Sequence, residues 1–462
     1  MNAFTKMTLL FVGICFHALQ SAAQIDKAAQ IEKLIHNANH LGLFNGNVLI
    51  ADQGKIIYKT AVGHADASGK VKLTGQYRFS IGSIAKEFNA VGIMLLKEQG
   101  KLSLEDPVSK YLPELPPWSS GIKIKNLLQY SSGLPKFQWN VIQNDADNME
   151  HLKKTKQLDF EPGTQYSYNN NDVFLQRRII EKISGQSFKE FAVQRLLKPA
   201  AMHTAIVDPG DKDPFIARSY DNQGKEDPLD YHLSGWVSVT TDDLYKWSNA
   251  LNKFRLIGPL STKELSQTFA WRTQCGLGSL TMENNKIISH KHDGSNSNYQ
   301  ALLLSTTENG RTVILMTNQM QNNLYALNNS IQAILDGKPY DQIKKSFGKS
   351  FRPQIEQLDG KQLLAFYHQI KKEHGEEYNF NEENELNEIG YKFLRGNKLA
   401  DAILIFEYNT VLFPQSGNVF DSLGEAYYKQ GDKVKALLNY QQSFRLDPAN
   451  ETAKKIIAEL DH

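Results

Sequence analysis

The chain has 462 residues, with 52 Lys and Arg against 50 Asp and Glu, a formal net charge of +2 and 41% hydrophobic residues. This length exceeds what one ordinary core organises, so two or three domains are expected. The balanced charge leaves no basic stripe and no acidic tail, which argues against a nucleic-acid partner. The composition is that of a globular protein without low-complexity tracts.

The first 23 residues predict a secretory signal peptide that is cleaved between Ala23 and Gln24. Lys6 is the only charged residue there, the apolar run MTLLFVGICF follows it, and small residues end the segment. A transmembrane anchor is the weaker interpretation, because a span needs about 20 apolar residues. Lipidation at Cys15 is disfavoured, since Ile14 is larger than the residue that usually precedes such a cysteine. We therefore expect an exported bacterial protein, periplasmic or secreted, without a transmembrane anchor.

Residues 24–337 are expected to form one mixed α/β domain. A helical pattern covers 27–39, and the stretch GNVLIADQGKIIYKTAVG alternates into two strands about a turn at 52–54. Two further strands flank a turn at 308–310, and a helix is predicted from Leu324 to Leu335. Strands near both ends and helices between them predict one antiparallel sheet, closed by segments that are distant in sequence.

The stretch RFSIGSIAKEFNAVGIMLL places Ser83 and Lys86 three residues apart at the start of a predicted helix that is apolar almost all round. A buried lysine loses its charge readily, so Lys86 could act as a base for a nucleophilic Ser83. Backbone N–H groups at a helix start can also hold a developing oxyanion. The spacing alone does not decide this, because Ser-x-x-Lys recurs at Ser120 and Ser346. In the structural alternative, Ser83 is a cap and Lys86 a solvated flank.

A second candidate motif is Tyr168-Asn169-Asn170, which lies on extended backbone before a predicted helix. Residues two apart on extended backbone point to the same side, so Tyr168 and Asn170 could face one cleft. The phenol could shuttle a proton, and the amide could hold a substrate carbonyl. The structural alternative is a tyrosine packed at a domain seam and an asparagine that caps the helix. Tyr220 and Asn222 share the spacing.

A third candidate lies in the stretch ISHKHDGSNSNYQALLL. His292 could bind a substrate carboxylate or tune the lysine and the tyrosine, Gly294 lets backbone approach a ligand, and Ser295 could offer a second oxyanion N–H. His290 and His292 could together bind zinc, but a third ligand is not evident, so we expect no metal and no cofactor. Cys275 is the only cysteine left after signal cleavage, which excludes an intramolecular disulfide.

The C-terminal residues 384–462 repeat at an offset of 34. The matched pairs are Gly390/Gly424, Phe393/Tyr427, Ala402/Ala436, Phe406/Tyr440 and Pro414/Pro448. This period, with its small, aromatic and proline positions, resembles the tetratricopeptide repeat, a pair of antiparallel helices. Residues 338–383 are expected to be a linker and capping helices. The repeats would form either a groove for a peptide or protein partner or a packing module.

Three motifs follow one another in the order typical of a serine hydrolase family: Ser83-x-x-Lys86, Tyr168-x-Asn170 and His292-x-Gly294. The chain thus resembles the class C β-lactamases, D-alanyl-D-alanine carboxypeptidases and related esterases, which are penicillin-binding-protein-like. Flanking segments such as FSIGSIAK, NLLQYSSGLP and EPGTQYSYNN agree, over about residues 30 to 336. The third motif departs from the Lys-Thr-Gly of class C β-lactamases, and His-x-Gly is more similar to the family's peptidases and esterases.

The resemblance implies a β-lactamase/transpeptidase-like α/β fold, with an antiparallel sheet flanked by helices, an all-helical region and the site between them. The all-α repeat domain would follow. It also implies acyl transfer, with these roles: Ser83 attacks a carbonyl, Lys86 or Tyr168 takes its proton, the N–H groups of Ser83 and Ser295 hold the oxyanion beside Gly294, and Asn170 and His292 orient the substrate. Water then releases the acid.

The implied substrate is an amide or ester, such as a D-amino-acid peptide, a peptidoglycan stem or a small ester. The loop from Lys136 to Asn140, with Phe137 and Trp139, is expected to border the acyl pocket. Two other functions stay open: a protein that hydrolyses or binds β-lactams, and a non-catalytic peptide-binding module that uses the repeats.

Overall fold

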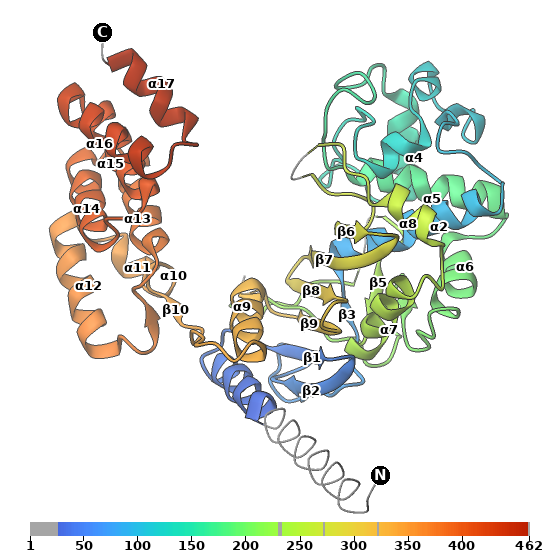
Figure 1. The fold of residues 1–462 in the computed structure, drawn as a ribbon, viewed down its shortest axis with the longest axis horizontal. Coiled ribbons are helices and arrows are strands. Elements are labelled where there is room, and N and C mark those ends of the chain that lie inside the picture. The colour runs from blue at the N-terminus through green and yellow to red at the C-terminus, as the bar shows by residue number, and fades with distance from the viewer. Residues whose placement is uncertain (1–25, 230–232, 271–272, 321–322, 461–462) are drawn as a thin grey trace, which may run out of the picture. The chain divides into compact units, whose positions relative to one another are not determined.

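The computed structural model describes residues 26–229, 233–270, 273–320 and 323–460. The chain forms two compact units, residues 1–342 and 343–462 (Figure 1). The predicted signal peptide lies outside the described residues. Within the described ranges, no helix combines the length and the apolar character that crossing a membrane requires.

The first unit is built on a six-stranded antiparallel sheet in the order β2-β1-β9-β8-β7-β6. Its strands are β1 (Gly46–Asp52), β2 (Lys55–Val62), β6 (Ser279–Glu283), β7 (Lys286–Asn296), β8 (Tyr299–Thr306) and β9 (Arg311–Thr317). Gly46 of β1 pairs with Thr317 of β9, so segments more than 260 residues apart share one ladder. The predicted closure of the sheet by distant segments is therefore confirmed.

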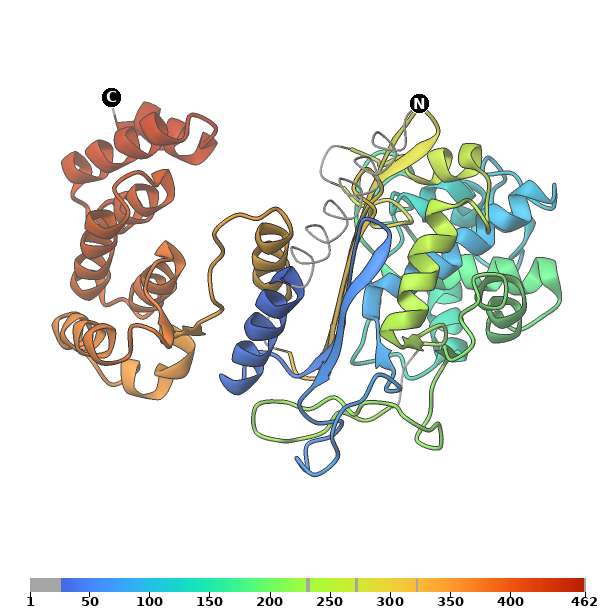
Figure 2. The ribbon, with the colours of Figure 1, turned by 60° about the horizontal axis from the view of Figure 1, so that its bottom comes forward.

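Helices cover both faces of this sheet, which explains why every residue of β1 and β9 is buried. The helix at 26–40 and α9 (Leu324–Leu335) lie side by side on one face, whereas α7 (Thr241–Asn252) packs on the other (Figure 2). The edge strand β2 is exposed or half-buried at every residue except Val62.

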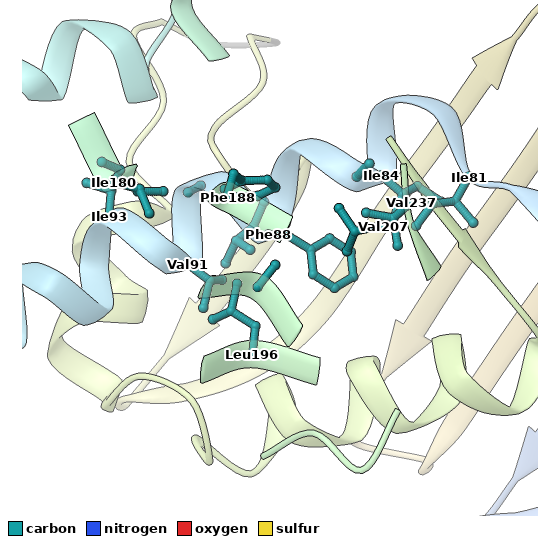
Figure 3. Packing of buried hydrophobic residues seen from close by; sticks show 14 of the residues in the cluster. Ile81, Ile84, Phe88, Val91, Ile93, Ile180, Phe188, Leu196, Val207 and Val237 are labelled. Carbon is teal, nitrogen blue, oxygen red and sulfur yellow. The ribbon is translucent and has the colours of Figure 1, made fainter. Parts of the chain in front are cut away.

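Helix α2 (Lys86–Glu98) runs through the centre of the unit. Phe88, Val91 and Ile93 of α2 pack beside Ile180, Phe188 and Leu196, which come from the surrounding helical region (Figure 3). That region contains α3 (Ile124–Leu128), α4 (Asp145–Lys154), α5 (Asn170–Ser184), α6 (Phe188–Ala192) and α8 (Pro259–Leu265). A helix buried on all sides is fixed in position, so its first turn is a rigid platform for a site.

The segment before α2 differs in detail from the sequence prediction. Ser83 lies in the short 3₁₀ turn η1 (Gly82–Ala85) that leads into α2, one turn ahead of the α-helix itself. Gly82 has a φ of +52°, a left-handed conformation that glycine adopts without strain. Ile81 and Ile84 anchor this turn against Val207 and Val237 of a small sheet of order β3-β5-β4 (Figure 3). Its strands are β3 (Phe79–Ser80), β4 (Ile206–Val207) and β5 (Val237–Val239).

The second unit is helical, apart from a short parallel pair of β10 (Lys345–Ser346) and β11 (Tyr378–Asn379). It contains α10 (Phe347–Ser350), α11 (Arg352–Ile355), α12 (Gly360–His374), α13 (Glu383–Arg395), α14 (Leu399–Leu412), α15 (Gly417–Gln430), α16 (Lys433–Leu446) and α17 (Glu451–Leu460). The pairs α13/α14 and α15/α16 begin 34 residues apart, as the sequence period requires.

The repeated small residues of this unit pack against the repeated aromatic residues. A Cβ atom at Gly390 would lie 2.4 Å from the Phe406 ring, and one at Gly424 would lie 3.1 Å from the Tyr440 ring. Each glycine thus allows the two helices of its pair to approach closely. The unit is consistent with a helical repeat domain.

Candidate active site

Ser83 and Lys86 lie together at the start of α2. Lys86 Nζ is 3.0 Å from Ser83 Oγ, a hydrogen-bond distance. Burial, and to a smaller degree the positive charge of Arg177, lowers the pKa of Lys86 to about 7. Near neutral pH a large share of this amine is therefore unprotonated and able to accept a proton from the serine.

The other two Ser-x-x-Lys copies make structural contacts instead. Ser120 Oγ donates to the carbonyl of Pro117 at 2.7 Å, and this copy's lysine forms a surface ion pair. Ser346 caps α10, because its Oγ accepts from the backbone N–H of Lys349. Only the copy at Ser83 combines a buried lysine with a direct contact between the two side chains, among the three.

Tyr168 comes from the segment that precedes α5, and its ring faces Lys86. Lys86 Nζ lies 5.0 Å from the centroid of that ring. The Tyr168 hydroxyl is buried and has no hydrogen bond of ordinary geometry to a described residue. Burial raises the pKa of Tyr168 to about 12, although the nearby Ser83 hydroxyl counteracts part of this rise. The phenol is therefore protonated at neutral pH and is a better proton donor than base.

The two asparagines after Tyr168 take different roles. Asn169 is the N-cap of α5 and is buried, and its side chain donates to the carbonyls of Leu134 and Pro135. It points away from the cleft, as strand alternation predicts. Asn170 is the first residue of α5 and lines a pocket together with Lys86. The cap that the structural alternative assigned to an asparagine is thus Asn169, which leaves Asn170 facing the site.

Strand β7 passes so close to η1 that only glycine fits where the two backbones cross, at Gly294 of β7 and Gly82 of η1. A Cβ at Gly294 would lie 2.1 Å from the carbonyl oxygen of Ile81 and 2.6 Å from the backbone nitrogen of Ser83. A Cβ at Gly82 would lie 2.4 Å from the backbone nitrogen of Ser295. The two glycines therefore bring the N–H groups of Ser83 and Ser295 into the same small region.

His292 does not line the cleft. Buried and exposed residues alternate along this part of β7, and His292 is one of the buried ones. Its Nδ1 lies 2.7 Å from Glu87 Oε1. His290 Nε2 reaches the same oxygen at 2.8 Å, and Trp247 Nε1 donates to Glu87 Oε2 at 2.6 Å. The prediction that His292 touches the substrate is not supported by this geometry, because its side chain is buried against Glu87 and lines neither hollow beside Ser83.

These four residues form what we call the Glu87 cluster: Glu87, His290, His292 and Trp247. Burial on its own would raise the pKa of Glu87, but the two imidazoles hold it well below its usual range. The carboxylate is therefore ionised, and each histidine donates an N–H to it.

Glu87 is also the third residue that a zinc site at His290 and His292 would need. The separations of 2.7 and 2.8 Å between nitrogen and oxygen are those of hydrogen bonds. A zinc ion with bonds of about 2.0–2.1 Å in tetrahedral geometry would hold its ligand atoms more than about 3 Å apart. The cluster as it stands is a hydrogen-bonded core, with no room between these atoms for an ion.

Two hollows flank the Ser83–Lys86 pair. One, of about 380 Å³, is lined by Ser83, Tyr166, Tyr168, Gln274, Asp293, Gly294 and Ser295. The other is narrow, about 30 Å³, and lies on the side of Lys86 and Asn170. Trp139 of the loop at 136–140 borders this second pocket, whereas Phe137 is buried behind it, 4.6 Å from the Trp139 ring.

The structure thus brings Ser83, Lys86, Tyr168, Asn170, Gly294 and Ser295 together and turns His292 to the interior. Sequence reasoning missed Glu87 and Arg177. Each had a signal: Glu87 is an acid in the first turn of an otherwise apolar helix, and Arg177 shares an apolar helix face with Val173 and Ile180.

Comparison with known proteins decides the family. A model described as Beta-lactamase matches residues 31–336, well over half of the chain. The chain belongs to the beta-lactamase family. Penicillin-binding protein 4* of Bacillus subtilis is 27% identical over 359 residues, which cover 68% of this chain and 78% of that protein. Protein flp of Staphylococcus aureus is 26% identical over 315 residues, 63% of either chain.

Solved structures at 20–22% identity share the fold of this chain. A penicillin-binding protein homologue from Pyrococcus abyssi has a TM-score of 0.58 at 22% identity, covering 67% of this chain and 77% of its own. A class C beta-lactamase gives 0.57 at 20% identity, with coverages of 68% and 97%. D-amino acid amidase from Ochrobactrum anthropi gives 0.56 at 20% identity, with 67% and 98%. The predicted serine hydrolase family and its fold are therefore confirmed.

Proposed function

We propose that the protein is an exported serine hydrolase that cleaves an amide or ester through an acyl-enzyme. One observation carries this: the amine of Lys86, largely removed from water and with a pKa near 7, lies 3.0 Å from Ser83 Oγ at the border of a cleft. A base within hydrogen-bond reach of a hydroxyl, with a pKa matched to neutral pH, is what a serine nucleophile needs.

The proposed reaction uses the geometry as follows. Ser83 Oγ attacks the substrate carbonyl while its proton passes to the unprotonated amine of Lys86. In this proposal the N–H groups of Ser83 and Ser295 stabilise the oxyanion, which the close approach of the two backbones at Gly82 and Gly294 supports. The protonated phenol of Tyr168 borders the larger hollow, supplies a proton to the leaving group and regains one from the Lys86 ammonium. Water then attacks the ester at Ser83 while Lys86 takes a proton from it, and the acid departs as this proton returns to Ser83 Oγ.

The positions of Tyr168 and Asn170 indicate which part of the substrate would occupy each of the two hollows. The leaving group needs a proton donor beside it, so it belongs in the larger hollow with Tyr168. The acyl portion then points to the narrow pocket beside Asn170 and Trp139. Among the substrates that the sequence predicts, D-amino-acid peptides and small esters fit a site divided in this way.

We also propose that the second unit binds a peptide or a partner protein. Two helix pairs at an offset of 34 support a tetratricopeptide-type array. Such arrays hold peptides or partner proteins, which would place the hydrolase near a particular partner outside the cytoplasm.

A fluorophosphonate probe followed by intact mass spectrometry tests the nucleophile. We expect one adduct on the wild type and none on Ser83→Ala. Ser120→Ala is the matched control, because it removes the serine of another Ser-x-x-Lys copy and should still be labelled. Absence of any adduct on the wild type would favour a binding protein over an enzyme.

A substrate panel then separates the hydrolase types. D-Ala-D-Ala peptides, p-nitrophenyl esters and nitrocefin are offered to the wild type and to Ser83→Ala. Turnover of peptides or esters that vanishes in the variant supports the proposal. Rapid turnover of nitrocefin alone would favour the β-lactam-hydrolysing alternative.

A further inference from the structure

Arg177 is a buried arginine that faces the narrow pocket. It lies on α5, two turns after Asn170, and only 5% of its surface is exposed. Lys86, Asn170, Trp139 and Gly235 share the lining of this pocket with it. Arg177 therefore lines the pocket beside Lys86 and not the hollow that Ser83 shares with Tyr168.

The guanidinium has no polar partner in the part of the chain that the structure describes. Its Nε is buried without a hydrogen bond, and no carboxylate forms an ion pair with it. Its guanidinium carbon lies 5.9 Å from the centroid of the Phe174 ring, which is a cation–π distance. Burial lowers the pKa of Arg177 to about 10, so the group remains charged at neutral pH. A buried charge without a partner is costly and calls for an explanation.

The nearest acids are engaged elsewhere. Asp145 pairs with Arg178 at 3.1 Å and accepts from Ser234. Asp208 accepts the backbone N–H groups of Gly235 and Trp236. They act on Arg177 only through longer-range electrostatics.

Arg178 shows what a structural arginine in this helix looks like. Its guanidinium pairs with Asp145 at 3.1 Å and with Glu181 at 3.0 Å, and it donates to Ser234. Arg177, one residue earlier, has none of these partners and is aimed into the pocket instead. A purely structural role for Arg177 does not explain why it lacks the partners of Arg178, because packing alone does not require a guanidinium at this position.

We propose that Arg177 binds a carboxylate on the acyl portion of the substrate, so that the enzyme prefers acyl groups that end in an acid. The inference rests on the proposed function. The pocket's volume of about 30 Å³ accommodates roughly two water-sized groups, the size of the two carboxylate oxygens. A guanidinium binds a carboxylate through paired N–H donors, and exclusion from water strengthens that contact.

Matched esters test this preference. The p-nitrophenyl monoesters of succinate, glutarate and adipate are compared with neutral diesters, in which the free carboxylate of each monoester is methylated. The hydrolysis rate measured with Ser83→Ala is subtracted from every rate. We expect the wild type to favour the best monoester by about 10- to 100-fold in kcat/KM. In Arg177→Met this ratio should fall towards one, whereas Arg178→Met should keep it. The ratio cancels any change in the basicity of Lys86, because both esters use the same base.

A wild-type enzyme that hydrolyses both ester types equally, by way of Ser83, would overturn the inference and leave the proposed function standing. A binding measurement keeps the test open even if no ester is turned over. Succinate, glutarate and adipate are titrated into Ser83→Ala, with the neutral dimethyl esters as controls. We expect at least one diacid to raise Tm, and this shift to disappear in Ser83→Ala/Arg177→Met. No shift with any of the three diacids would refute the carboxylate site, whereas failed labelling of Ser83 bears on the proposed function alone.

Discussion

The Glu87 cluster and the pocket at Arg177 lie on two sides of the same helix start, and they treat a buried charge in opposite ways. Glu87 receives an N–H from each of His290, His292 and Trp247. Arg177 donates no hydrogen bond to the described residues and forms no ion pair with them. The comparison teaches that a satisfied buried charge holds a structure in place, whereas an unsatisfied one leaves capacity for a ligand.

The two regions therefore have different roles around Ser83: the Glu87 cluster is structural, and the residues at Arg177 line a pocket. The Glu87 cluster ties α2 to β7, because Glu87 is on the helix and both histidines are on the strand. Gly294, which crosses the Ser83 turn, lies two residues after His292 on that strand. Arg177, in contrast, lines a pocket beside Lys86.

Lys86 sits between the two regions, and its substitution should have the largest effect. In Lys86→Met we expect kcat/KM for a p-nitrophenyl ester to fall by about 10²- to 10⁴-fold, because the general base is lost. Lys97→Met is the matched control, since Lys97 pairs with Glu264 near the far end of the same helix. A loss of less than tenfold in Lys86→Met would show that another group takes the serine proton.

The next largest effect should be on stability, in Glu87→Gln. Removing the charge from a buried carboxylate that accepts three hydrogen bonds should lower the free energy of unfolding by about 3 kcal/mol, measured by urea denaturation. Glu264→Gln, which breaks a half-exposed ion pair of the same helix, should cost less than about 1 kcal/mol.

At acidic pH, the difference in the free energy of unfolding between Glu87→Gln and the wild type should become smaller. The folded-state pKa of Glu87 is depressed, so its contribution to stability is present above the unfolded pKa of about 4.3 and is lost as pH falls below that value. Parallel stability curves from pH 7 to pH 3 would contradict the ionised carboxylate.

Arg177→Met should behave in the opposite way to Glu87→Gln. Burial lowers the pKa of Arg177, so folding disfavours its charged form, and an apolar side chain of similar length should leave stability unchanged or raise it. Arg178→Met should destabilise, because it leaves Asp145 without its ion pair. If Arg177→Met loses more than about 1 kcal/mol in the same assay, the two regions do not differ as described.

The smallest expected effect is on the pH profile. With Lys86 as the base, kcat/KM should rise through an apparent pKa near 7. The charge of Arg177 lowers the pKa of Lys86, so Arg177→Met should move this limb modestly to higher pH, since burial is the larger cause. Arg178→Met should leave the limb in place, and a downward shift in Arg177→Met would contradict the coupling.

Patterns that act within a few turns of chain could be predicted from the sequence. Alternation and turn residues located the strands around residues 52–54 and 308–310, and the apolar period located α9 at Leu324–Leu335. The offset of 34 predicted two equivalent helix pairs, because each repeat makes the same local contacts. The order of the three motifs was enough to predict the family and its fold.

The directions of side chains across distant segments could not be predicted in the same way. His292 was expected at the substrate, but strand alternation turns it inward, and only the packing of β7 on α2 reveals Glu87 as its partner. The zinc hypothesis lacked a third residue for the same reason, since Glu87 is more than 200 residues away in sequence.

The sequence by itself determined which segments become strands and helices, and which residue types carry reactive groups, because these depend on periodicity and on each side chain's own chemistry. Only the tertiary structure decided which of three Ser-x-x-Lys copies has a buried lysine, and which of two neighbouring arginines lacks a partner. Desolvation and charge pairing arise when segments distant in sequence meet, and these two effects set the pKa of Lys86 and the state of Arg177.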